Sequence, residues 1–461
     1  MTTPITIESL QFGYQKKQNI LNISQLSIPT NQLTIFYGKS GCGKSTLLKI
    51  IAGLLPKYGG HLSGIINLPD HLTCAMMFQD PALQFALDTP RHEIEFALEN
   101  QQVSAQRIPQ LTHQALEEVG ILHLAERHFT TLSGGEQQRA SLAVIIAMNP
   151  QIILLDEPFA SLDFHNRTLI IQQLKKLLQT GKTIIIADHD LAAYDSLHPL
   201  IIDFNNHLQP LSLAATHTLL DRFNQPNNVP ATLPQLTDPA AISLHNFTLR
   251  RQNQLLIQQS ELTIYKNKVT LLTGESGSGK SSFFKALTKI IPFDGTVQLF
   301  DRPLKNYSSH LLGQTLGLVF QNANDQFLKV TVQEELELSL KNGQHPYFNR
   351  SRLADAITKL GLQHLTNQVV YSLSGGQKKK LQLLVMLMMG QSFLLLDEPF
   401  SGLDQQSIAN VIDLIHNCQQ VLPQTILIIS HQLTGLDSLI DYHLNLSGRQ
   451  LSYQGRPSHE S

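Results

Sequence analysis

Eight consecutive residues have the composition of a phosphate-binding loop. They lie between an apolar run and a helical pattern, and they read Gly38-Lys39-Ser40-Gly41-Cys42-Gly43-Lys44-Ser45. The glycines let the backbone wrap so that successive N–H groups point at phosphate oxygens, and the N-terminus of the following helix faces the same anion. Lys44 would contact the terminal phosphates, and the hydroxyl of Ser45, followed by Thr46, would bind Mg²⁺. The stretch therefore predicts a site for ATP and Mg²⁺.

The same chemistry occurs a second time in the chain. The second loop reads Gly274-Glu275-Ser276-Gly277-Ser278-Gly279-Lys280-Ser281 and is followed by Ser282. Four other motifs also recur in the same order and at a nearly constant spacing: a glutamine after Phe (Gln79, Gln321), a Leu-Ser-Gly-Gly run (from Leu132, from Leu373), an Asp-Glu-Pro run (from Asp156, from Asp397) and a histidine (His189, His431). Five motifs in one order indicate a domain duplication.

Buried strands must position these side chains. The Asp-Glu-Pro runs follow two continuous apolar stretches, 152–155 and 393–396. A short run without alternation is typical of a strand that is buried on both faces of a parallel sheet. The fold class is therefore α/β, with the polar residues at the strand ends.

Composition narrows the class of protein. The chain has 461 residues, of which 42% are hydrophobic, and a net charge of −2. Nothing in this balance indicates a nucleic-acid partner. The three cysteines show no metal-binding spacing, which is typical of a reduced, cytosolic protein. No apolar run approaches the roughly 18 residues of a membrane span, and the N-terminus lacks the pattern of a signal peptide. If the protein acts at a membrane, other chains must supply the span.

A proline-rich stretch divides the chain. Four prolines with Asn and Gln between them are typical of a linker, and they are Pro226, Pro230, Pro234 and Pro239. We expect a first domain at 1–223, a linker at 224–240 and a second domain at 241–461.

Each half resembles the nucleotide-binding domain of an ABC ATPase. The resemblance rests on all five motifs and covers almost the whole chain apart from the linker. It implies two P-loop NTPase ABC domains in tandem, each with a mainly parallel sheet, an antiparallel β-subdomain and a helical subdomain. It also implies ATP hydrolysis.

The resemblance assigns a role to each motif residue. Asp156 and Asp397 would hold Mg²⁺ together with Ser45 and Ser281. Glu157 and Glu398 would act as general bases on the attacking water. Gln79 and Gln321 would contact the metal and the γ-phosphate, and His189 and His431 would contact the γ-phosphate.

In this family the Ser-Gly-Gly motif completes the nucleotide site of the partner domain. The two halves are therefore expected to pair head to tail within the chain. Ser374 and Gly376 would complete the first site, and Ser133 and Gly135 the second, with Asp163 and Asp404 at the interface. Both sites have a full residue set, so both are expected to hydrolyse ATP.

Three differences separate the halves. Tyr14 occupies the position of the adenine-stacking aromatic, whereas an alignment of Phe12 with Phe247 places Leu249 there, which predicts weaker nucleotide binding at the second loop. Cys42 lies near a helix N-terminus that would lower its pKa, so a reactive thiol is one of two even alternatives. The run Lys378-Lys379-Lys380 replaces Gln137-Gln138-Arg139; a solvated helix face is favoured over a membrane contact.

A second glutamine follows the first by five residues in each half, at Gln84 and Gln326. This pattern resembles the ATPases of energy-coupling-factor (ECF) importers, which take up vitamins and transition metals. The resemblance implies a transmembrane coupling subunit, a substrate-binding membrane subunit, and a peripheral position at the cytoplasmic face of the cell membrane. The helices after Thr89 and Thr331 would line the docking groove.

Matching acids on those two helices could make the groove acidic; they are Glu93 with Glu335 and Glu95 with Glu337. A solvated face, with acids favoured by the helix dipole, is the alternative.

Two other functions remain open. A tandem sugar-importer ATPase is the nearer alternative, although it would tend to be longer and would lack the glutamine pair. A ribosome-associated tandem ABC ATPase is the second, but such proteins usually carry a long charged helical linker, whereas the linker here is short and nearly uncharged. The cargo cannot be read from this chain.

Overall fold

The structure is a computed structural model that divides into two compact units, Met1–Gln225 and Pro226–Ser461. It describes residues 4–15, 19–69, 72–159, 162, 164–206, 208–224, 232–235, 237–251, 254–431, 433 and 435–455. Pro226 and Pro230 of the predicted linker, and Asp163 of the predicted interface, lie outside the described residues.

The first unit contains one mainly parallel sheet and one antiparallel sheet. The larger sheet has the order β5-β6-β7-β3-β8-β9, in which only the last pair is antiparallel. Its strands are β5 (Cys74–Met77), β6 (Ile152–Asp156), β7 (Thr183–Asp188), β3 (Leu33–Tyr37), β8 (Leu200–Asp203) and β9 (Gln209–Pro210). The antiparallel sheet has the order β2 (Leu21–Ile28), β1 (Ile5–Gly13) and β4 (His61–Asn67).

The second unit repeats this arrangement. Its larger sheet has the order β15-β16-β17-β12-β18-β19, again with one antiparallel pair at the end. These strands are β15 (Leu316–Val319), β16 (Phe393–Asp397), β17 (Thr425–Ile429), β12 (Val269–Gly274), β18 (Tyr442–Ser447) and β19 (Gln450–Gln454). The antiparallel sheet consists of β11 (Gln254–Tyr265), β10 (Ala240–Arg251), β13 (Asp294–Leu299) and β14 (Arg302–Pro303).

The apolar strand runs are continuous because both faces of each larger sheet are covered. Along β6, Ile153 and Leu155 belong to one hydrophobic core. The alternate residues, Ile152 and Leu154, belong to a second core that includes the antiparallel sheet. All four side chains are fully buried. A strand that is buried on both sides needs no polar alternation.

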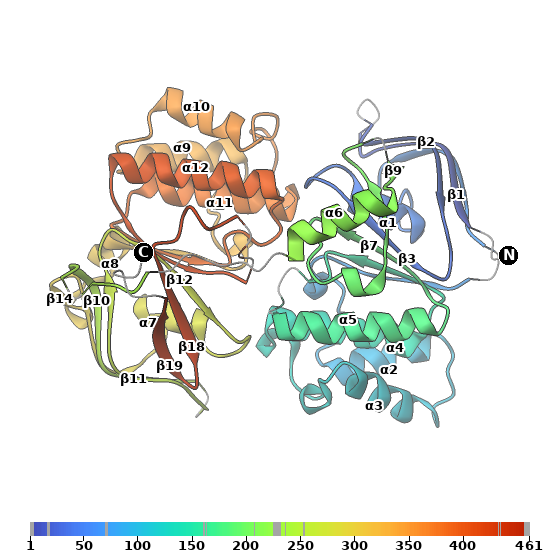
Figure 1. The fold of residues 1–461 in the computed structure, drawn as a ribbon, viewed down its shortest axis with the longest axis horizontal. Coiled ribbons are helices and arrows are strands. Elements are labelled where there is room, and N and C mark those ends of the chain that lie inside the picture. Colours follow the sequence, from blue (N-terminus) through green and yellow to red (C-terminus); the bar gives the residue numbers. More distant parts are fainter. Residues whose placement is uncertain are drawn as a thin grey trace. The chain divides into compact units, whose positions relative to one another are not determined.

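Helices complete each unit. Those of the first unit are α1 (Lys44–Ile51), α2 (Pro90–Asn100), α3 (Ile108–Glu118), α4 (Gly134–Met148), α5 (Phe164–Gln179) and α6 (Leu213–Asn224). Those of the second are α7 (Lys280–Leu287), α8 (Ser309–Thr315), α9 (Val332–Asn342), α10 (Arg350–Lys359), α11 (Gly375–Met389) and α12 (Gln405–Val421). In the second unit α9 and α10 lie together at one end with α11 and α12, and β10, β11 and β14 lie at the other end (Figure 1). The described residues contain no helix that is both long and apolar enough to cross a membrane.

Local sequence accounts for several helix starts. Thr331 caps α9 and Glu334 completes a capping box, as the sequence predicts. Ser133 and Ser374 cap α4 and α11 in the same way, with Glu136 and Gln377 as their partners. Each box satisfies N–H groups that the first helical turn leaves without a partner.

Candidate functional site

The first phosphate loop joins β3 to α1 and has the backbone that its sequence predicts. Gly43 has a φ of 102°, and a Cβ at this residue would lie 2.5 Å from Leu21 Cδ2, so only glycine fits. Lys44 Nζ donates to the carbonyls of Gly38 at 2.7 Å and Lys39 at 2.9 Å. The ammonium is thus folded over the loop. It lies inside the cradle in which phosphate oxygens would be held.

A hydroxyl and a carboxylate next to the loop fit a magnesium ion. Ser45 Oγ donates to Asp156 Oδ1 at 2.7 Å. Burial, and then the neighbouring Glu157 charge, raise the pKa of Asp156 to about 7. No group of three or more His, Cys, Asp or Glu side chains within the described residues could hold a metal alone. Mg²⁺ prefers oxygen ligands and commonly binds through one or two protein groups plus phosphates, which suits this pair.

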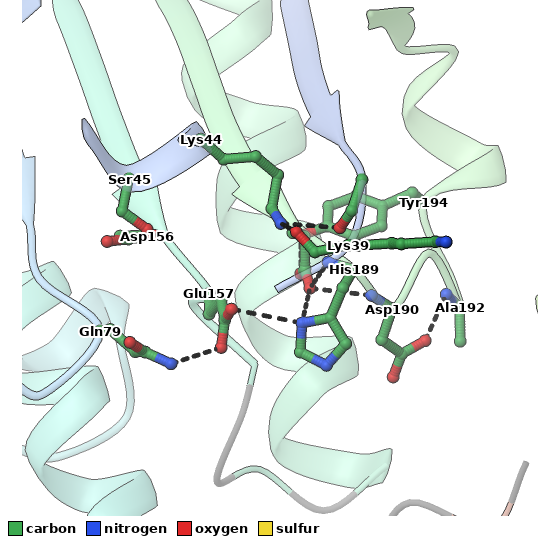
Figure 2. A network of polar contacts seen from close by, with 12 residues as sticks. Lys39, Lys44, Ser45, Gln79, Asp156, Glu157, His189, Asp190, Ala192 and Tyr194 are labelled. Atoms are coloured by element: carbon green, nitrogen blue, oxygen red, sulfur yellow. Dashed lines mark hydrogen bonds and ion pairs between the residues drawn. The ribbon is translucent and has the colours of Figure 1, made fainter. Parts of the chain in front are cut away.

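Three further predicted residues meet at the ends of β6 and β7 (Figure 2). Gln79 Nε2 donates to Glu157 Oε2 at 2.7 Å. His189 Nδ1 lies 3.3 Å from Glu157 Oε1. Burial disfavours the charged form of both side chains, but their mutual attraction outweighs it. His189 lowers the pKa of Glu157, and Glu157 raises the pKa of His189 to about 9. The structure therefore brings Gln79, Glu157 and His189 together beside the loop as an ion-paired group.

Behind His189 lies a polar network whose members the motifs alone do not assign to the site. Asp188 is buried and accepts hydrogen bonds from the N–H of His189 at 2.7 Å and from the Tyr194 hydroxyl at 2.9 Å. Arg167 donates to Asp190 at 2.8 Å and stacks over Phe159. The Asp188-His189-Asp190 run is the sequence signal for this network, because two acids that flank a histidine at the end of a strand can orient its ring.

The second loop has the same local geometry. Lys280 Nζ donates to the carbonyls of Gly274 and Glu275, both at 2.8 Å. Ser281 is hydrogen-bonded to Asp397, and burial raises the pKa of that carboxyl. Asp397 Oδ1 is buried and has no hydrogen-bond partner among the described residues. This open carboxylate oxygen also fits a cation.

The second catalytic group is arranged differently from the first. Glu398 accepts from the N–H of His431 at 3.2 Å, and its Oε1 lies 3.5 Å from His431 Nε2. Burial and Asp397 raise the pKa of Glu398 to about 8. Within the described part of the chain, no hydrogen bond joins Gln321 to Glu398. Both general-base candidates share one backbone feature, a positive φ of 46° at Glu157 and 48° at Glu398.

The Ser-Gly-Gly motifs lie at helix N-termini, apart from the catalytic group of their own unit. Ser133 and Ser374 are the N-caps of α4 and α11. Ser133 also interacts with Glu136 Oε2 at 2.9 Å. Among the described contacts, Ser133 makes none to Lys44 or Glu157. A helix N-terminus with free N–H groups is suited to bind an anion.

The prediction that Leu249 occupies the position equivalent to Tyr14 is wrong. Both first strands contain a bulge at a residue with φ of 49°, Ser9 in β1 and Asn246 in β10. Superposing the bulges matches Leu249 with Phe12. Both side chains are fully buried, and they occupy the same place in the strand pair: Leu249 is opposite Ile257, and Phe12 is opposite Leu21.

Arg251 then matches Tyr14. Tyr14 is 47% exposed and its hydroxyl lies 3.4 Å from Thr46 Oγ1, beside the first loop. Arg251 is exposed as well and pairs with Gln254 at the end of its strand. An arginine can stack on an aromatic ring through its planar guanidinium. The expected loss of base stacking at the second loop therefore no longer follows from Leu249.

Burial bears on two other expectations. Of the two even alternatives for Cys42, burial favours the unreactive thiol, because it raises the pKa of Cys42 although Lys44 opposes the shift. Lys379, predicted on a solvated helix face, is only 6% exposed. Its ammonium donates to the carbonyls of Gln321 at 2.6 Å and Phe320 at 3.3 Å.

Glu93 and Glu335 do not form an acidic groove. They are 7% and 3% exposed. Glu93 Oε2 accepts from the N–H groups of Ala86 and Leu87 at 2.9 and 2.8 Å, and Glu335 Oε2 accepts in the same way from Leu328 and Lys329 at 3.0 and 2.7 Å. Each glutamate therefore holds the loop before its helix. Of the four acids, Glu95 and Glu337 keep some exposure.

The second glutamine of each pair also has a structural role. Gln84 Oε1 accepts from the N–H of Phe78 at 3.2 Å, and its Nε2 donates to the Met76 carbonyl at 3.1 Å. Gln326 Oε1 accepts from the N–H of Phe320 at 3.3 Å. Each glutamine thus fastens its loop to the end of the edge strand that precedes it.

Two regions of the chain match the family model described as "ABC transporter", at residues 21–160 and 257–401. The chain belongs to the ABC transporter family. The prediction of two ABC nucleotide-binding domains in tandem is confirmed. Both matched regions contain a phosphate loop, a glutamine, a Ser-Gly-Gly motif and an Asp-Glu-Pro run. ABC domains of this kind bind ATP, typically with Mg²⁺, and family membership supports ATP hydrolysis.

Curated relatives of this ABC ATPase match along nearly its full length. A Bacillus subtilis protein named "Putative HMP/thiamine import ATP-binding protein YkoD" is 28% identical, and the match covers 98% of this chain and 92% of that protein. A "Putative ABC transporter ATP-binding protein" of Treponema denticola is also 28% identical, with 97% and 96% covered. These names describe ATP-binding subunits of transporters.

Solved structures share the tandem fold. The structure titled "RNase-L Inhibitor" has a TM-score of 0.62 at 20% identity and matches 97% of this chain and 90% of that chain. The "Model of ribosome-bound archaeal Pelota and ABCE1" has a TM-score of 0.69 at 18% identity, with 97% and 78% covered. At these identities the likeness shows the fold of the tandem ABC ATPase alone.

Proposed function

We propose that this chain is the ATP-hydrolysing subunit of an ABC importer of the energy-coupling-factor type. The observation that carries the proposal is that each unit gathers the Lys, Ser, Asp, Glu and His of its motif set beside its own phosphate loop. The full-length similarity to a protein named as a thiamine import ATPase supports the transport role. Under this proposal the cargo is a vitamin, a cofactor precursor or a metal ion, and separate membrane subunits select it.

Within the first unit the proposed division of labour follows the contacts. Lys44 binds the terminal phosphates, while Ser45 and Asp156 hold Mg²⁺, which would neutralise phosphate charge. Glu157 orients the attacking water and accepts its proton, and its lowered pKa keeps it ionised. The bond from Gln79 to Glu157 occupies one carboxylate oxygen. Gln79 must therefore release Glu157, or share it, when water and nucleotide are bound.

We further propose that the halves pair head to tail when ATP binds. The capping boxes of α4 and α11 use the N–H groups of the cap residue and of the third helical residue, so the N–H groups of the two glycines between them suit a γ-phosphate. Ser374 and Gly376 would complete the first site, and Ser133 and Gly135 the second. A cysteine pair at Asp163 and Asp404, the positions expected at the interface, should then cross-link within one chain in the presence of ATP in a Glu157→Gln background. If cross-links form only between chains, the intramolecular pairing is wrong.

Exposed apolar residues near α2 and α9 support docking of membrane subunits. Leu83 and Leu328 are 79% and 80% exposed, and Leu87, Phe96 and Val330 are exposed as well. Large apolar side chains that face solvent near one another commonly mark a protein interface. Since the nearby acids are partly buried, the docking surface is proposed to be apolar rather than acidic.

Affinity capture from detergent-solubilised membranes tests the transport role. The tagged chain should retain integral membrane proteins, and Leu83→Asp with Leu328→Asp should reduce their recovery without lowering basal ATPase activity. Capture of the membrane subunits of a sugar importer would instead favour a tandem sugar-importer ATPase. Capture of ribosomal proteins, without membrane proteins, would refute the importer proposal and favour a ribosome-associated ATPase.

A further inference from the structure

A buried lysine lies next to the second catalytic group. Lys379 is the fifth residue of α11 and is 6% exposed. Its ammonium donates to the carbonyl of Gln321 at 2.6 Å and to that of Phe320 at 3.3 Å. Burial lowers the pKa of Lys379 to about 8, against the opposing charges of Asp397 and Glu398. A lysine in such a place is costly unless its donors are used.

The first unit has a different residue at this position. Gln138 is the fifth residue of α4 and is 2% exposed. Its Oε1 has no hydrogen-bond partner among the described residues. The Ser-Gly-Gly helices of the two units therefore present different groups to the glutamine loop that begins at Gln79 or Gln321.

A second residue on the same face of α11 adds to the contrast. Gln382 lies one turn after Lys379 and donates to the Phe320 carbonyl at 2.9 Å and to Gln326 Oε1 at 3.3 Å. At the corresponding place in α4, the one hydrogen bond that Ser141 donates from its side chain among the described residues goes to Gln84 Oε1, at 3.3 Å. The second glutamine loop is thus attached to its helix through its backbone carbonyls. The first loop is attached through a side chain, and Gln79 itself rests on Glu157.

We propose that Lys379 is a positioning residue that fixes the backbone of Gln321 and so sets the placement of this glutamine in the second nucleotide site alone. The inference rests on the proposed function only in so far as the second site hydrolyses ATP. Lys379 does not touch the reacting atoms. It acts through Gln321. Lys379 holds the backbone carbonyl of Gln321, so the side chain is not needed to anchor the loop and stays available for metal and water.

The experiment uses the full chain with Glu157→Gln, so that turnover reports the second site. Adding Lys379→Met keeps the volume and removes the donors. We expect kcat to fall about tenfold while the ATP KM changes by less than about twofold, because a misplaced group costs rate more than ground-state binding. The melting temperature should change little, because the loss of two donated hydrogen bonds is offset by the removal of a buried charge. Lys379→Arg, which keeps donors, should restore part of kcat.

Lys378→Met is the matched control, because it removes the same charge from the adjacent position. Hydrogen exchange of the amides at 320–326 supplies a readout that does not depend on turnover, and it should be faster in Lys379→Met. Unchanged kcat and exchange, or the same losses in Lys378→Met, would overturn the inference. If the Glu157→Gln parent is itself inactive, independent hydrolysis at the second site fails instead, and unchanged exchange alone then refutes the role of Lys379.

Discussion

Replacing Glu335 by glutamine tests whether this acid holds a loop or recruits a partner. The buried carboxylate accepts two backbone N–H bonds, at 3.0 and 2.7 Å, from Leu328 and Lys329. Hydrogen bonds to a charged group contribute about 1.5–3 kcal/mol each, against about 1 kcal/mol for neutral pairs. The amide of glutamine retains an acceptor oxygen but loses the charge. We therefore expect a loss of about 2 kcal/mol from the stability of the second unit.

Calorimetry of the full chain measures this loss. For a unit of this size, 1 kcal/mol corresponds to about 2–4 °C, so the melting transition of the second unit should fall by about 4–8 °C. Glu337→Gln, on the same helix but exposed, should stay within about 0.5 kcal/mol of the parent. Glu93→Gln should lower the first transition in the same way. Unchanged stability in Glu335→Gln, combined with loss of membrane partners, would refute the structural role and restore the acidic groove.

Three further predictions concern individual side chains. Arg251→Ala should weaken ATP binding at the second site about two- to fivefold, the size of an exposed cation–π contact, in a fluorescent-nucleotide titration with Lys44→Ala, which removes the phosphate-binding ammonium of the first site; no change would leave Arg251 outside the site. At pH 7.5 Cys42 should be alkylated more slowly than a free thiol, and its alkylation rate should keep rising above pH 9, because its raised pKa delays thiolate formation. An alkylation rate that reaches its plateau below pH 8 would contradict burial of the thiol. Tyr194→Phe should destabilise the first unit by about 1–2 kcal/mol in urea titration, because Asp188 loses a buried hydrogen bond; neutrality would mean that the bond contributes nothing.

Much of the fold and of each site could be predicted because the signals are local. The apolar run that ends at Asp156 predicts a doubly buried strand, and β6 is that strand. The glycines of the first loop predict its backbone, and Lys44 folds over it. The chain order of the motifs predicts the two units, since parallel strands place their carboxyl ends at one edge of a sheet.

The wrong predictions all depend on features that spacing does not reveal. Phe12 and Phe247 share a residue type but not a position in their strands, and only the bulges at Ser9 and Asn246 fix the register, so the alignment of the two phenylalanines misplaced the partner of Tyr14. The burial of Glu335 depends on a loop that folds back over its own helix. Lys379 belongs to a run of three lysines, and only the packing of α11 on the glutamine loop distinguishes it from its neighbours.

The two units share a fold but stabilise their catalytic groups by different means. In the first, Glu157 is paired with His189 and with the side chain of Gln79. In the second, Glu398 is paired with His431 and accepts from its N–H, no hydrogen bond joins it to Gln321 among the described residues, and Lys379 holds the glutamine loop by its backbone. Under the proposed mechanism Gln79 must release or share Glu157 before that carboxylate acts on water, whereas Gln321 makes no such contact with Glu398. We therefore expect the two single-site variants to differ in rate, as a consequence of sequence differences as small as Gln138 against Lys379.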